Sequence, residues 1–106
     1  MNLSDLRAAN LKRQSFWDPE GLVTPLYRSN EMGGEVGEAM NVVKKLEREK
    51  LGIRGSRDTV EHLAQELADI IICADLVAME YDIDLGAATR EKFNATSDAV
   101  GIDVKL

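Results

Sequence analysis

The chain has 106 residues, which is a typical length for one domain folded around one core. Its net charge is −6, from 19 acidic and 13 basic residues, and no basic stripe of the kind that binds duplex nucleic acid is visible. The single cysteine excludes an intrachain disulfide and a cysteine zinc cluster, and the single histidine excludes a multi-histidine metal site. Apolar residues make up 44% of the chain but aromatics only 5%, a composition that favours helices over sheets.

The first predicted helix covers about residues 4–15, with Ser4 as its N-cap. Its packed side is expected to carry Leu6, Ala9 and Leu11. The following segment, FWDPEGLVTP, contains two prolines and a glycine, so we expect a loop there. This loop carries the only tryptophan, Trp17.

The second helix is predicted to start near residue 29 or 30 and to end at Leu51, with Gly52 as a left-handed C-cap. Apolar residues at three- and four-residue intervals predict one buried face, formed by Met32, Val36, Ala39, Val43 and Leu46. Three early glycines, at positions 33, 34 and 37, each cost about 1 kcal/mol of helix stability relative to alanine. Such small residues allow a helix or a ligand to approach the backbone closely.

A polar loop, GIRGSRD, precedes a third helix that we expect Asp58 to cap and that should continue to about Tyr81. Its middle, LAQELADIIICADLVAM, is apolar on nearly all sides and should be the most buried part of the chain. Asp84 should cap a fourth helix from Leu85 to about residue 100, which Gly101 ends. The sequence therefore predicts an all-α fold, a four-helix bundle formed by one domain over residues 1–106.

The sequence also carries expectations about location. The N-terminal segment MNLSDLRAANLKRQ is charged and amphipathic and lacks the apolar core of a signal peptide. The longest apolar run, residues 70–74, is far shorter than a membrane span. We therefore expect a cytoplasmic protein that has neither a membrane nor a nucleic acid as its partner.

Two acidic residues, Glu66 and Asp69, interrupt the most apolar predicted helix. Three residues apart, they share one face of it. An isolated carboxylate buried there costs several kcal/mol, so each needs a cation, a proton or hydrogen bonds. One alternative to a metal ion is a buried salt bridge to Lys44, Lys45 or Arg48.

The second helix carries a similar pair of acidic residues three positions apart, Glu35 and Glu38, with Glu31 one turn earlier. The 27 residues 39–65 between the two pairs suffice for a turn and an antiparallel return, which brings the pairs opposite each other. Oxygen ligands without histidine or cysteine select Mg²⁺, Mn²⁺ or Ca²⁺ over zinc, and Mg²⁺ readily binds phosphates. The alternative for Glu35 and Glu38 is an ordinary solvated helix face.

The pattern Glu35-Val-Gly-Glu38, 27 residues, and Glu66-Leu-Ala-Asp69 resembles the ExxE…ExxD signature of the MazG-like all-α nucleoside triphosphate pyrophosphohydrolases. The segments EVGEAMNVVKKLEREKLG, LAQELADIIICADL and KFNATSDAVG are similar to blocks of one bacterial and phage branch of this family. The resemblance covers most of residues 22–101. The paired motifs in an all-helical chain of this size are quite specific.

The resemblance implies a four-helix unit that forms homodimers or homotetramers. It implies that Glu35, Glu38, Glu66 and Asp69 are catalytic and hold Mg²⁺, with Mn²⁺ as an alternative. The ion would bind a (deoxy)nucleoside triphosphate and activate a water that splits the α–β anhydride, giving monophosphate and pyrophosphate, as in housecleaning of nucleotide pools. Glu35 or Glu31 could accept the proton of this water.

The chain also departs from the family pattern. Many members have two adjacent glutamates where this sequence has Gly34-Glu35. Members also often place a lysine and an asparagine four residues apart on the last helix, in contact with the nucleotide. Here that spacing joins Arg90 to Asn94, while Lys92 lies two residues before the asparagine. We expect Asn94 and Lys92 to bind substrate, with Arg90 as an alternative.

Other residues have two interpretations each. Lys45 either contacts phosphate or pairs with Glu49 on a solvated face. Trp17 either stacks on the nucleotide base or covers the core. His62, one turn before Glu66, either supports that residue or lies on the surface. Cys73 is expected in the core.

Two further expectations concern assembly and the rival functions. A chain this short covers so apolar a third helix poorly, which predicts a homo-oligomer. The alternatives to an enzyme are a nucleotide- or metal-binding module without turnover and a structural helical module that binds a partner.

Overall fold

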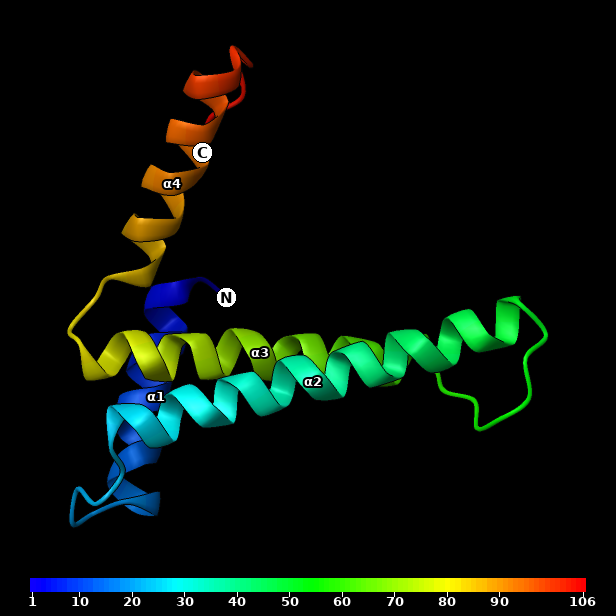
Figure 1. Cartoon of the computed structure of the whole chain (residues 1–106). Helices are drawn as coiled ribbons and strands as arrows, with labels where there is room; N and C mark the ends of the chain where they lie inside the picture. The colour runs from blue at the N-terminus through cyan, green and yellow to red at the C-terminus, as the bar shows by residue number, and fades with distance from the viewer.

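The computed structural model describes residues 1–106 and contains four α-helices and no strand (Figure 1). The helices are α1 (Leu3–Trp17), α2 (Pro25–Lys50), α3 (Val60–Glu80) and α4 (Leu85–Val100). The predicted all-α class and the number of helices are confirmed. None of the four helices is both long enough and apolar enough to cross a lipid bilayer.

The long helices α2 and α3 form an antiparallel pair joined by the loop at residues 51–59 (Figure 1). Helix α1 crosses this pair near the start of α2 and the end of α3. Helix α4 has its main contact with α1 and extends away from the α2–α3 pair, so a single chain does not close a four-helix bundle. The radius of gyration is 17.1 Å, against about 13 Å for a compact domain of this length.

Helix boundaries follow local capping, and the starts of α1 and α2 differ from the sequence prediction. Helix α1 starts at Leu3 because Asn2 and Asp5 form a reciprocal capping box, in place of the expected Ser4 cap. Helix α2 starts at Pro25, several residues before the expected start, because proline fits the first position of a helix and Thr24 caps it.

The remaining boundaries are closer to expectation. Thr59 rather than Asp58 is the N-cap of α3, and it accepts a hydrogen bond from the backbone N–H of His62. Asp84 caps α4, and Gly101 ends it in the left-handed conformation with φ of 73°, both as predicted.

The buried positions of α1 and α2 differ from those expected from periodicity. Leu11 is 52% exposed, whereas the neighbouring Asn10 is buried. On α2 the buried apolar residues are Ala39 and Val42, while Val36 and Val43 face solvent in the single chain. Only ten of the 106 residues are buried, and half of these lie on α3, where Cys73 belongs to the core as predicted.

An ion pair fixes α1 against α3. Asp75 is 1% exposed and accepts hydrogen bonds from Arg7 Nε at 3.1 Å and from Asn10 Nδ2 at 2.9 Å. Arg7 also donates from Nη2 to the carbonyl of Ile83, which ties the start of α4 to α1. Both oxygens of this buried carboxylate therefore have partners, as a buried charge requires.

Replacing Arg7 by Met should lower the free energy of unfolding by about 3 kcal/mol, because the carboxylate of Asp75 stays buried with only one amide partner. Urea denaturation followed by circular dichroism measures the loss. Lys12→Met, an exposed change on the same helix, should stay within about 0.5 kcal/mol of the wild type. Equal stability of the two variants would show that this pair does not hold α1 in place.

Candidate metal centre

Three carboxylates from the two acidic motifs meet at the α2–α3 contact. Glu35 and Glu38 of α2 and Glu66 of α3 each place one oxygen within 4.8 Å of the others. The i,i+3 spacing puts the two α2 residues on one face, and the antiparallel return of α3 brings Glu66 opposite them. The structure thus brings together three of the four acidic residues that the sequence singled out.

Asp69, the fourth acidic residue, has a different environment. Its side chain is exposed and its oxygens lie outside the group formed by the other three. It nevertheless lies close enough to Glu35 that its charge raises the pKa of that carboxyl. Asp69 is therefore at the edge of the cluster, rather than among the converging oxygens.

The cluster carries negative charge that no lysine or arginine neutralises, and its one basic neighbour is His62, which contacts Glu66. Burial raises the pKa of Glu35 above its ordinary value, and the carboxylates of Glu38, Asp69 and Glu66 raise it further. One oxygen of Glu35 and one of Glu66 are buried without any hydrogen-bond partner. Unsatisfied buried oxygens are rare in proteins and call for a missing partner.

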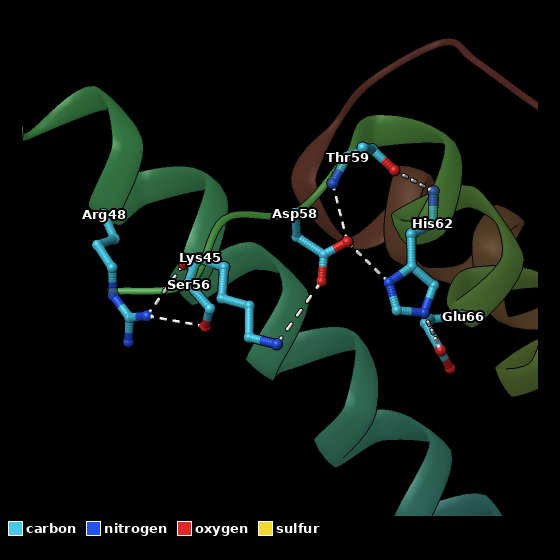
Figure 2. Close-up of polar contacts among 7 residues, drawn as sticks. All are labelled: Lys45, Arg48, Ser56, Asp58, Thr59, His62 and Glu66. Carbon is cyan, nitrogen blue, oxygen red and sulfur yellow. Dashed lines mark hydrogen bonds and ion pairs between the residues drawn. The ribbon is translucent and has the colours of Figure 1, made fainter. Parts of the chain in front are cut away.

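The salt-bridge alternative for Glu66 and Asp69 is wrong. Neither residue pairs with a lysine or arginine: Lys45 instead lies 3.9 Å from Asp58, and Arg48 donates to the carbonyl of Ser56. The alternative pairing of Lys45 with Glu49 is not formed either, since Lys45 Nζ faces Asp58 (Figure 2).

His62 is the partner of Glu66, and it combines both sequence interpretations, because it contacts Glu66 while its side chain stays 44% exposed in the capped first turn of α3. Its Nε2 lies 2.8 Å from Glu66 Oε1, and its Nδ1 lies 2.8 Å from Asp58 Oδ1 (Figure 2). The bond to Asp58, followed by the contact with Glu66, raises the pKa of His62 above its ordinary value. The signal in the sequence was the four-residue spacing of positions 58, 62 and 66, which places His62 and Glu66 on one face of α3 and Asp58 in the turn just before it.

The residues expected to bind nucleotide do not gather at the carboxylates within one chain. Arg90, Lys92 and Asn94 lie on α4, which extends away from the α2–α3 pair (Figure 1). Asn94 exchanges two hydrogen bonds with the backbone of Leu106. Trp17 is 69% exposed at the end of α1, where the guanidinium of Arg13 covers its ring, so it does not cover the core.

The residues present fit a hard divalent cation. The converging donors are carboxylate oxygens only, which suits Mg²⁺ or Mn²⁺ and disfavours softer metals. The two buried oxygens without partners are the sites at which a cation would replace lost hydration.

Comparison with known proteins returned no match among protein-family models, curated proteins or solved structures.

In metal-free buffer at neutral pH, Glu35→Gln should raise the melting temperature, because the neutral amide removes the repulsion and reduces the cost of burial. A carboxyl whose pKa is raised by folding makes stability fall as the pH rises past its ordinary pKa, so the variant should show a smaller fall between about pH 4 and pH 8. Mg²⁺ should stabilise the wild type more than the variant.

Thermal unfolding with EDTA and then with Mg²⁺ measures both effects. The exposed Glu91→Gln serves as the matched control and should respond to pH and Mg²⁺ as the wild type does. A lower melting temperature for Glu35→Gln in EDTA would contradict the repulsive cluster.

Proposed function

We propose that this chain is a Mg²⁺-dependent pyrophosphohydrolase of nucleoside triphosphates of the MazG-like kind, producing a monophosphate and pyrophosphate. The observation that carries the proposal is the convergence of Glu35, Glu38 and Glu66 from two helices, with two buried oxygens lacking partners. A structural or adaptor module gains nothing from such an arrangement, because it lowers stability without a compensating contact.

The residues that would hold the ion are Glu35, Glu38 and Glu66, with Asp69 at the edge of the cluster. Mg²⁺ supplies positive charge that binds phosphate oxygens and activates a water for attack on phosphorus. Among the acids, Glu35 is best suited to accept a proton, because its pKa is raised. Glu31 is less suited, because its carboxylate pairs with Arg28 at 3.0 Å.

We also propose that the chain acts as a homo-oligomer, a dimer or a tetramer. Helices α2 and α3 expose a set of apolar side chains beside the carboxylates: Val36, Met40, Val43, Leu67 and Ile71. A group of exposed apolar side chains like this one often marks an interface with another protein. The extended α4 would then pack on a second copy, and Arg90, Lys92 and Asn94 would reach a nucleotide there. Lys45 and Trp17 remain proposed contacts to the phosphate and the base.

The activity is tested by pyrophosphate release from a panel of natural and modified nucleoside triphosphates. The wild type should require Mg²⁺. Glu66→Ala should lower turnover by at least about 100-fold, because it removes a proposed metal ligand, and losing only a residue that supports a ligand usually costs about 10- to 100-fold. Glu91→Gln should keep full activity. Binding of Mg²⁺ and triphosphate without pyrophosphate release would instead indicate a binding module.

Assembly is tested by sedimentation velocity. The wild type should sediment as a dimer or a tetramer, and Met40→Glu should shift it towards the monomer, since a charge in an apolar interface is strongly disfavoured. Leu22→Glu, in the loop before α2, should leave the assembly unchanged. A wild-type monomer at all concentrations would exclude the oligomer.

A further inference from the structure

Three polar side chains form a line along one face of α3 and the turn before it. Asp58 Oδ1 lies 2.8 Å from His62 Nδ1, and His62 Nε2 lies 2.8 Å from Glu66 Oε1 (Figure 2). The imidazole ring lies between two carboxylates and contacts one of them with each of its nitrogens. The line therefore runs from the loop at residues 51–59 to the carboxylate cluster.

The outer end of this line is firmly anchored. Asp58 Oδ1 also accepts the backbone N–H of Thr59 at 2.8 Å, and its Oδ2 lies 3.9 Å from Lys45 Nζ of α2. The side chain of Asp58 is nearly buried and lies at the positive N-terminal end of α3, where a negative charge is stabilised. The ring of His62 thus has a fixed partner on the side away from Glu66.

At the inner end of this line, the two carboxylate oxygens of Glu66 have different environments. Oε1 is held by His62, whereas Oε2 is buried and has no partner. Glu66 as a whole is only 9% exposed, so solvent does not supply the missing contact. Oε2 is thus the oxygen of Glu66 that has no partner, and Glu66 offers one oxygen to the group that includes Glu35 and Glu38.

We propose that Asp58 and His62 form a positioning relay that fixes the carboxylate of Glu66, so that Oε2 alone binds a divalent cation shared with Glu35 and Glu38. The inference rests on the proposed metal centre and assigns it a further pair of residues. His62 and Asp58 act through Glu66 and are positioning residues, because neither takes part in the group of converging oxygens.

Metal affinity is the first readout, measured by calorimetry with Mn²⁺ and Mg²⁺ in the absence of nucleotide. His62→Ala should weaken binding by about 10- to 100-fold, the usual effect of losing the partner of a metal ligand. His62→Gln should recover most of the affinity, since its amide can donate to Glu66 from the same helix position. Gln65→Ala, an exposed change on the same helix turn, should bind as the wild type does.

A double-mutant cycle tests whether Asp58 acts through His62. Asp58→Asn should weaken metal binding in the same direction as His62→Ala, and the double variant should be no weaker than His62→Ala alone. Additive losses would overturn the relay. Circular dichroism spectra at the assay temperature confirm that all variants are folded.

The ring itself gives a readout that needs neither metal nor activity. His62 is the only histidine, so its imidazole nitrogen signals in NMR spectra are assigned without ambiguity. Because one nitrogen contacts Asp58 and the other contacts Glu66, Asp58→Asn should change the ring signals of the wild type. Ring signals that stay unchanged in Asp58→Asn would overturn the relay.

The outcomes separate this inference from the proposed function. A wild type that binds neither Mn²⁺ nor Mg²⁺ overturns both. A wild type that binds the ions and hydrolyses triphosphates, together with a His62→Ala variant of equal affinity, overturns the relay and leaves the pyrophosphohydrolase proposal standing.

Discussion

Repulsion among carboxylates at the α2–α3 contact is the constraint on which the candidate site depends. Two such charges about 5 Å apart repel by about 3 kcal/mol at an effective dielectric constant near 20, and three of them converge here within 4.8 Å. Neither lysine nor arginine pairs with Glu66, and burial adds to the penalty on Glu35. The fold brings these side chains together at a cost in stability, and a divalent cation is the partner that we propose for them.

The two buried acidic residues of α3, Asp75 and Glu66, differ in how many of their carboxylate oxygens have hydrogen-bond partners. Asp75 has hydrogen-bond partners on its carboxylate from Arg7 and Asn10, and it joins α1 to the helical pair. Glu66 has a partner on one oxygen only. A fully paired carboxylate is what a structural role requires, whereas a buried oxygen without a partner is typical of a site that awaits a ligand. This contrast within one helix supports a functional interpretation of Glu66.

The single chain is open, and this openness bears on substrate binding. Helix α4 extends from the rest, the core is thin, and apolar side chains of α2 and α3 face outward beside the carboxylates. A nucleotide needs more than a metal: it needs groups around its base and sugar. Within one chain the α4 candidates do not lie next to the cluster, so a second copy is the simplest source of those contacts in the proposed assembly.

The sequence by itself determined the helical class, the two acidic motifs and the caps at Asp84 and Gly101, because propensity, spacing and capping act within a few residues. It also indicated that the motifs would meet, since a short polar loop between long helices returns the chain antiparallel. Only the tertiary structure decided that Asn10 rather than Leu11 is buried, that Asp69 stays at the edge, and that His62 holds Glu66. These outcomes depend on the rotation of each helix about its axis. Packing between segments distant in the sequence sets that rotation, and local periodicity does not encode it.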